Sequence, residues 1–310
     1  MKLNKPKFWD KKIGIIAISI FPLSLVFWIL VFINKIITKE KKFKIPIICI
    51  GNIYLGGTGK TPTSLFIAKE LLSSGKRPAI LRKNYKNHVD EYNLIKNSFK
   101  DLIVDQSRVD GLRKMENLNF DTAILDDGFQ DHTIKKDFSI ICFNKNQLIG
   151  NGLLLPAGPL RDSLSTLRNA DVILINGDKD KDFEQRVLKI NKHLEIFYSS
   201  YVPYNLEDFK NKKLLAIAGI GNPENFFSLL NKYNLNIEKK LVFPDHYNFS
   251  KKEIEDIIME AEKKNFQIIM TEKDFFKIDH YKFQNIRYLK VSLKINEKEK
   301  LLKKINSLYD

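Results

Sequence analysis

The sequence predicts an α/β protein, built on a doubly wound parallel sheet and completed by a second, smaller α/β domain. After residue 44, short apolar runs of strand length alternate with longer amphipathic stretches of helix length. Most of these runs are continuously apolar, which is typical of strands buried on both faces of a parallel sheet. A glycine-rich segment follows the first run directly. Together these patterns indicate repeated βαβ units with a ligand site after the first strand.

The alternation of apolar and amphipathic segments divides the chain into three parts: residues 1–38, 39–200 and 201–310. We expect the first part to be a membrane-anchor helix with basic flanks, the second the core domain, and the third a C-terminal α/β domain. The polar stretch Tyr201–Lys213 is the expected connection between the last two. The predicted strands of the core domain are Ile45–Ile50, Pro78–Leu81, Leu102–Val104, Thr122–Leu125, Ser139–Phe143 and Val172–Ile175.

Amphipathic stretches between these runs predict the helices. In the core domain the predicted helices are Lys60–Ser74, Arg108–Asn117 and Lys181–His193. In the C-terminal domain the predicted strands are Leu214–Ala218, Gln267–Thr271 and Arg287–Val291, and the predicted helices are Pro223–Tyr233, Lys251–Lys264 and Asn296–Leu308.

Positive charge is concentrated at the N-terminus. The formal net charge is +15, and residues 1–44 hold ten lysines against only Asp10 and Glu40. This placement favours an anionic membrane surface, and we expect no nucleic-acid partner. Cys49 and Cys142 lie far apart inside apolar runs, without the spacing of metal ligands, and are expected to be buried thiols.

A membrane segment is predicted between the two lysine clusters. Ile13–Ile33 is a run of 21 residues without a charge. As a helix it is roughly 30 Å long, which matches a bilayer core. A secretory signal peptide has a shorter apolar stretch followed by a cleavage site of small residues, and neither feature is found here. Because lysines flank both ends, the sequence leaves open whether the helix spans the membrane or lies in its surface.

The strongest chemical signal is the glycine-rich segment GNIYLGGTGKTP at residues 51–62. Glycines let backbone N–H groups close around phosphates, and the N-terminus of the following helix adds its positive dipole. The residues expected to bind a nucleotide are Gly56, Gly57, Thr58, Gly59, Lys60 and Thr61. Lys60 would reach the phosphates and Thr61 would coordinate Mg²⁺. Tyr54 departs from the general pattern, which has glycine five positions before Gly59.

Two carboxylates end another apolar run. Asp126 and Asp127 follow the predicted strand Thr122–Leu125. The carboxyl ends of parallel strands form the ligand-binding edge of open α/β sheets. An Asp-Asp-Gly sequence alone is also common in a turn at the end of a strand. Next to the phosphate loop, it predicts a Mg²⁺ site in which both aspartates take part.

At this point the residues resemble the tetraacyldisaccharide 4′-kinases, the lipid A 4′-kinases, over nearly the whole chain. The motifs that carry the resemblance are GNIYLGGTGKTP (51–62), DEYNLI (90–95), ILDDGFQD (124–131), GNGLLLPAGPLRD (150–162), FPDHYNF (243–249) and TEKD (271–274).

The resemblance implies an ATP- and Mg²⁺-dependent kinase at the cytoplasmic face of the inner membrane. It would phosphorylate the 4′-hydroxyl of a tetraacyl glucosamine disaccharide 1-phosphate in lipid A (lipopolysaccharide) biosynthesis. It also implies two α/β/α domains connected by a β-ribbon hinge. By the same resemblance, Asp90 falls where the family has the carboxylate that activates the sugar hydroxyl, and His246 where a histidine supports it. Each has a plainer interpretation, an exposed loop acid for Asp90 and a turn residue for His246.

Four further residues are candidates for substrate binding. Three glycines, two prolines and a leucine triplet predict a stiff, partly apolar loop at Gly150–Asp162. This loop is either a rigid crossover or a platform for the lipid, in which Arg161 faces the acceptor's phosphate. Arg108, Gln130 and Tyr85 are the other three candidates.

The chain departs from the family after its second predicted strand. The family usually has Ser-Arg-Gly-Tyr, whereas this chain has Arg82-Lys83-Asn84-Tyr85. A lysine cannot reproduce the two-pronged phosphate contact of an arginine, so the role of position 83 is open. Asp131 also stands where many relatives have histidine or asparagine. The phosphate loop and both metal carboxylates are unaffected.

Two other functions agree with parts of the sequence. A membrane-attached P-loop ATPase that acts as a regulatory switch would share the phosphate loop and Asp126, but would not need the Gly150–Asp162 loop or Asp90. A basic, non-enzymatic membrane module that binds nucleic acid or acidic lipid would explain the charge but leave the phosphate loop without a role. ATP hydrolysis insensitive to a lipid acceptor would favour the first, and salt-dependent DNA binding the second.

Overall fold

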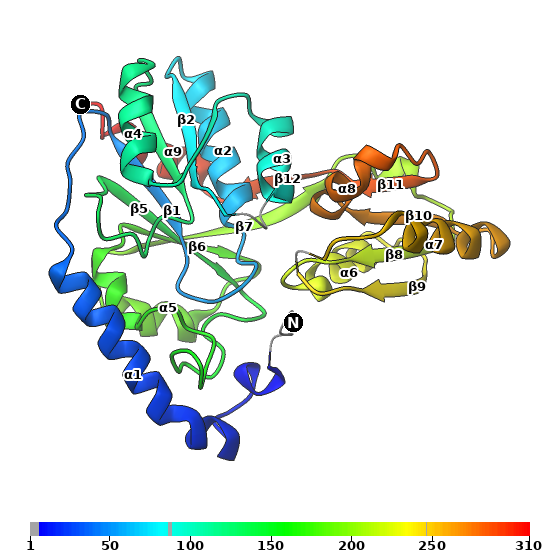
Figure 1. Ribbon diagram of the computed structural model, residues 1–310, viewed down its shortest axis with the longest axis horizontal. Coiled ribbons are helices and arrows are strands. Elements are labelled where there is room, and N and C mark those ends of the chain that lie inside the picture. Colours follow the sequence, from blue (N-terminus) through cyan, green and yellow to red (C-terminus); the bar gives the residue numbers. More distant parts are fainter. Residues whose placement is uncertain (1–5, 86–88, 246) are drawn as a thin grey trace. The chain divides into compact units, whose positions relative to one another are not determined.

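The computed structural model describes residues 6–85, 89–245 and 247–310, and the side chains of all of these except residues 89 and 90. It confirms the predicted α/β class, with a large, mainly parallel sheet and a smaller parallel sheet (Figure 1). The chain forms two compact units. The larger contains Phe99–Ser200, the preceding chain from residue 6 to Asn84, and Ile295–Asp310; the smaller contains residues 89–98 and Tyr201–Lys294.

The larger unit is organised by a sheet of eight strands in the order β12-β7-β6-β5-β1-β4-β2-β3. From β7 to β3, each strand runs parallel to its neighbour. The strands are β1 (Ile47–Gly51), β2 (Pro78–Lys83), β3 (Leu102–Asp105), β4 (Thr122–Asp126), β5 (Phe138–Asn144), β6 (Val172–Asn176), β7 (Glu195–Pro203) and β12 (Val291–Ile295). Because β1 and β4 are neighbours, the phosphate loop after β1 and the two aspartates at the end of β4 lie at the same edge of the sheet.

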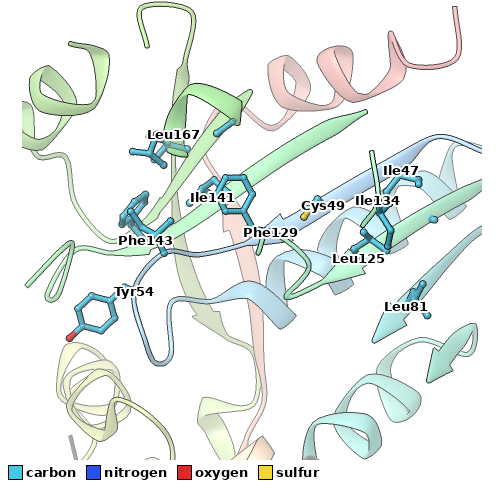
Figure 2. Close-up of a cluster of buried hydrophobic side chains, with 14 of the residues drawn as sticks. Ile47, Cys49, Tyr54, Leu81, Leu125, Phe129, Ile134, Ile141, Phe143 and Leu167 are labelled. Carbon is cyan, nitrogen blue, oxygen red and sulfur yellow. The ribbon is translucent and has the colours of Figure 1, made fainter. Parts of the chain in front are cut away.

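The helices of this unit are η1 (Lys7–Asp10), α1 (Ile15–Ile37), α2 (Lys60–Ser73), α4 (Arg108–Asn117), η2 (Leu164–Asn169), α5 (Lys181–Leu188) and α9 (Lys298–Asn306). Alternate residues of the central strands pack with α4 in one continuous core (Figure 2). Cys49 and Leu125 belong to this core, and so do Leu112 and Met115 of α4. Both cysteines are buried and free, as expected, and burial raises the pKa of each thiol to about 12.

The smaller unit has its own sheet of four parallel strands, in the order β11-β10-β8-β9. Its strands are β8 (Leu214–Ala218), β9 (Ile237–Val242), β10 (Gln267–Thr271) and β11 (Ile286–Leu289). Its helices are α3 (Val89–Ser98), η3 (Leu206–Asp208), α6 (Pro223–Lys232), α7 (Lys251–Lys263), α8 (Glu272–Ile278) and η4 (Asp279–Tyr281). Two apolar clusters are built on this sheet, one containing Phe227 of α6 and the other Ile254 of α7.

Several elements differ from the prediction, and helices α3 and α8 were not predicted at all. The stretch around Tyr201 was expected to be a connection, but it is the end of the nine-residue strand β7. β9 was missed because its residues alternate between half-buried and exposed and include charged side chains, as in an edge strand with one solvated face. The predicted strand Arg287–Val291 is divided at Lys290 between β11 and β12.

The units also differ from the expected segments 39–200 and 201–310. Helix α9 packs with the larger unit, where Leu301 and Ile305 are buried. Lys304 of this helix pairs with Glu195 of β7 at 2.8 Å. Helix α3 packs with the smaller unit, although it precedes most of the core in sequence. Within the chain, the boundary between the units falls inside β7 and at the end of β12, which are neighbouring strands.

Candidate active site

The phosphate loop leads from the last residue of β1, Gly51, to the first residue of α2, Lys60. Gly59 caps the helix with a φ of 94°, a left-handed conformation that favours glycine. The first bond of the helix runs from the Thr63 N–H to the Gly59 carbonyl, at 3.1 Å. The N–H groups of Lys60 and Thr61 therefore precede the hydrogen-bonded turns of α2. The start of this helix has the geometry of an anion site.

Asn52 stabilises the phosphate loop through hydrogen bonds within it. Its buried amide nitrogen donates to the Tyr54 carbonyl at 2.6 Å and to the Thr58 hydroxyl at 2.9 Å. Its backbone carbonyl accepts hydrogen bonds from Gln130 at 2.8 Å and from Arg161 at 3.1 Å. Arg161 also contacts the side-chain oxygen of Asn52. Asn52 thus fixes the shape of the loop and ties it to Gln130 and Arg161, two of the four predicted substrate residues.

Asp126 is the most enclosed acid of the site. Its Oδ2 accepts from the Thr61 hydroxyl at 2.9 Å and from the Arg82 guanidinium at 3.0 Å, and its Oδ1 accepts from Ser64 at 3.1 Å. The Asp126 side chain is fully buried and that of Arg82 is 5% exposed, so this is a desolvated ion pair. Thr61 and Asp126, two of the predicted Mg²⁺ ligands, therefore lie side by side, and their binding of a metal stays a prediction.

Asp127 faces the basic residues of the site. Its φ of 60° turns the chain sharply after β4. Its carboxylate lies 2.7 Å from Arg161 and 3.9 Å from Lys60. Burial alone raises the pKa of Asp127, but the nearby Lys60 and Arg161 cations outweigh it and hold the pKa well below its usual range. The carboxylate is therefore charged and available to a cation at neutral pH.

Arg108 and Gln130 hold the turn after β4 in place. The Arg108 guanidinium is buried and donates to the Asp127 carbonyl at 2.6 Å and to Asp131 at 3.0 Å. The Gln130 side-chain amide donates a hydrogen bond to the Asn52 carbonyl of the phosphate loop. In this conformation both side chains position site residues. Their contact with a substrate stays a prediction.

The remaining predicted residues lie elsewhere in the chain. Tyr85 is exposed, and its backbone N–H donates to the Tyr92 hydroxyl at 2.6 Å. Asp90 is the second residue of α3, in the smaller unit, and its side chain is outside the described residues. His246 also lies outside them. The structure thus brings together Lys60, Thr61, Asp126, Asp127, Arg161, Arg108 and Gln130, all in the larger unit.

Three residues of this network were not among the predicted site residues: Asn52, Ser64 and Arg82. Asn52 directly follows the first glycine of the loop, and Ser64 lies one helical turn after Lys60, so the motif and the period of 3.6 residues could have indicated both. Arg82 was noted only as a departure from a family motif. Its burial against Asp126 depends on the pairing of β2 with β4, which the sequence does not reveal.

A glycine-rich loop before a helix, a Lys-Thr pair at its start and an aspartate on the adjacent parallel strand define a P-loop phosphotransferase site. The sequence matches the profile of the family LpxK, tetraacyldisaccharide-1-P 4′-kinase, over residues 16–310. The chain belongs to this family, and its function is that of a lipid A 4′-kinase.

Relatives support this placement over the full length. The chain is 39% identical to the tetraacyldisaccharide 4′-kinase of Pelagibacter ubique (strain HTCC1062), covering 99% of both chains. It is 34% identical to that of Rickettsia akari (strain Hartford), over 98% of this chain and 97% of the relative. The crystal structure of LpxK from Aquifex aeolicus in complex with ATP has the same fold, with a TM-score of 0.72 at 24% identity, covering 96% of this chain and 100% of that one.

Proposed function

We propose that this kinase transfers the γ-phosphate of Mg-ATP to the 4′-hydroxyl of a lipid-linked glucosamine disaccharide, tetraacyldisaccharide 1-phosphate. The observation that carries the proposal is the arrangement around α2. The helix N-terminus, the Lys60 ammonium and the Thr61–Asp126 pair all converge on one edge of the sheet. Phosphoryl transfer depends mainly on positioning and on neutralising the charge of the phosphates, and these groups supply both.

The oxygen atoms of the site fit a magnesium ion. Thr61, Asp126 and Asp127 offer a hydroxyl and two carboxylates, the hard oxygen ligands that Mg²⁺ prefers together with phosphate oxygens. When bound, the ion neutralises charge on the phosphates of ATP. The chain's own contribution is to hold the Thr61 hydroxyl 2.9 Å from Asp126. Lys60 supplies a positive charge for the β and γ phosphates.

Arg161 has two roles in this proposal. It lies next to Asp127 and Asn52, so it stabilises the phosphate loop and the metal carboxylate together. Its guanidinium is also the group that we assign to the acceptor's phosphate, because a planar fork of donors suits a phosphate. If an Arg161→Ala variant kept the apparent affinity for the lipid unchanged, this would contradict the assignment of Arg161 to the acceptor's phosphate.

The acceptor hydroxyl needs a proton acceptor, for which we assign Asp90, supported by His246. Lys273 of α8 connects the segments that contain these two residues. Its ammonium lies 3.2 Å from Glu91, the neighbour of Asp90, and 3.0 Å from Asp245, the neighbour of His246. All three groups belong to the smaller unit. One cation thus ties both segments together, which supports a joint role for Asp90 and His246.

We expect Lys273→Met to lower turnover by about tenfold, because small shifts of a catalytic group are costly to the rate. The methionine has no ammonium group, so the ion pairs that join α3 to the segment before His246 are lost. The KM for ATP should stay unchanged, since the phosphate loop is in the other unit. Turnover and KM measured at saturating lipid check this result.

The matched control for Lys273 is Lys239→Met. Lys239 pairs with Glu260 at 2.6 Å in the same unit, so this variant also removes one lysine ion pair. Its turnover should equal that of the wild type, and Lys273→Arg should recover part of the lost rate. Equal turnover in Lys273→Met and Lys239→Met would contradict the positioning role.

The membrane is the expected location of the substrate, and α1 is the expected anchor. Among the described residues, α1 is the one helix long and apolar enough to cross a membrane. Only Ala17 and Ser24 of this helix are buried, and its other apolar side chains are mostly exposed. Exposed apolar surface of this extent flanked by lysines suits the anionic inner leaflet. We therefore assign the enzyme to the inner (cytoplasmic) membrane, with its active site on the cytoplasmic side.

Release of ADP tests the proposal against a P-loop ATPase switch. Purified protein in detergent micelles is supplied with Mg-ATP, with and without tetraacyldisaccharide 1-phosphate. A kinase releases ADP in proportion to the acceptor supplied and little without it. Equal ADP release with and without the acceptor would support the switch and contradict the proposal.

A further inference from the structure

Tyr54 occupies an unusual position in the phosphate loop. It stands where the general P-loop pattern has glycine, yet its side chain is fully buried and belongs to the core of the larger unit. In Figure 2 its ring lies at the margin of the core and its hydroxyl points away from the other labelled side chains. A large buried side chain at this position must be accommodated by neighbouring segments.

The Tyr54 hydroxyl is bonded to the N-terminal segment. It donates to Oδ1 of Asp10 at 2.7 Å, a contact that joins residues 44 positions apart. Asp10 is the last residue of η1, and the apolar helix α1 begins five residues later. A hydroxyl-to-carboxylate bond is charge-assisted and stronger than a neutral one. The segment next to the membrane helix therefore contacts the phosphate loop directly.

A second set of contacts joins the N-terminal segment to the phosphate loop through the Gly150–Asp162 loop. On the N-terminal side, Trp9 donates its indole N–H to the Pro156 carbonyl at 3.0 Å, and Ser24 of α1 donates to the Leu154 carbonyl at 2.9 Å. On the nucleotide side, the Leu55 N–H donates to the Pro159 carbonyl at 2.8 Å. The first half of the phosphate loop thus contacts both the anchor segment and the Gly150–Asp162 loop.

We propose that Asp10 and Tyr54 are positioning residues for the nucleotide: their hydrogen bond holds the first half of the phosphate loop in its binding shape, so that ATP affinity depends on the N-terminal anchor segment being in place. The glycine that the general pattern has at position 54 could form no such bond. Neither side chain needs to touch the nucleotide for this effect.

The test is a double-mutant cycle on nucleotide binding. The full-length protein is prepared in detergent as Tyr54→Phe, Asp10→Ala and the double variant, and the Kd for ATP is measured by calorimetry. We expect each single variant to weaken binding by about fivefold, an order of magnitude set by the worth of one part-buried, charge-assisted hydrogen bond. The double variant should bind no more weakly than either single one, since both remove the same bond.

Tyr198→Phe is the matched control. The Tyr198 hydroxyl also donates to a carboxylate, Glu184, at 2.6 Å within the same unit. Its loss should leave the Kd for ATP unchanged. Wild-type affinity in Tyr54→Phe, or additive losses in the double variant, would overturn the proposal. Should Tyr54→Phe fail to fold, Asp10→Ala, which changes an exposed residue, still decides it: an unchanged Kd for ATP contradicts the coupling.

Discussion

Replacement of Asp90 by asparagine is expected to lower turnover by about 10²- to 10⁴-fold, the usual contribution of a general base. The amide keeps the size of the carboxylate but cannot accept the proton of the sugar hydroxyl. The Kd for ATP should be unchanged, because the nucleotide loop is formed by the larger unit. Single-turnover measurements at saturating ATP and lipid, together with calorimetry for ATP, check both expectations.

The control for Asp90→Asn is Asp256→Asn. Asp256 is an exposed carboxylate of α7, in the same unit as Asp90. This variant makes the same chemical change on the surface and should retain full turnover. An Asp90→Asn enzyme with near-normal turnover and intact ATP binding would show that the base is another group.

The second large effect concerns stability. Arg82→Leu removes one partner of the buried Arg82–Asp126 pair and leaves a desolvated carboxylate without its cation. Breaking a buried pair in this way costs about 3–5 kcal/mol. We expect the lower end of this range, because the Thr61 and Ser64 hydroxyls still donate to Asp126. Denaturant unfolding in detergent micelles, without nucleotide or metal, measures the loss.

Arg113→Leu provides the comparison. Arg113 pairs with Asp110 at 2.9 Å, but both side chains are more than half exposed, 58% and 53%. An exposed pair contributes less than about 1 kcal/mol. The two arginine variants should therefore differ clearly in their unfolding midpoints. Equal midpoints would contradict the view that Arg82 stabilises the Asp126 carboxylate from within the core.

The fold could be predicted wherever one pattern dominated the sequence. The buried strands β1, β4 and β8 and the amphipathic helix α4 follow directly from continuous apolar runs and from the period of 3.6 residues. The edge strand β9 could not be distinguished from polar loop. The packing of α9 with the larger unit depends on its contacts with Glu70 and Glu195, which lie far away in sequence.

The site was predictable where its chemistry is local. Lys60 and Thr61 follow from one motif, and Asp126 follows from the end of a strand. Arg82 and Asp10 could not be found in this way, because each acts through a partner 44 residues away. The roles proposed for Asp90 and His246 rest on the family resemblance and on the ion pairs of Lys273 with Glu91 and Asp245, their neighbours in sequence.

The position of the transferred phosphate tests the proposed kinase activity most directly. Protein in detergent micelles is incubated with γ-labelled ATP, Mg²⁺ and tetraacyldisaccharide 1-phosphate, beside a Lys60→Ala variant. We expect label on the 4′-oxygen of the lipid with the wild type and its loss with the variant. Unlabelled lipid from an enzyme that still binds or hydrolyses ATP would contradict the proposed activity.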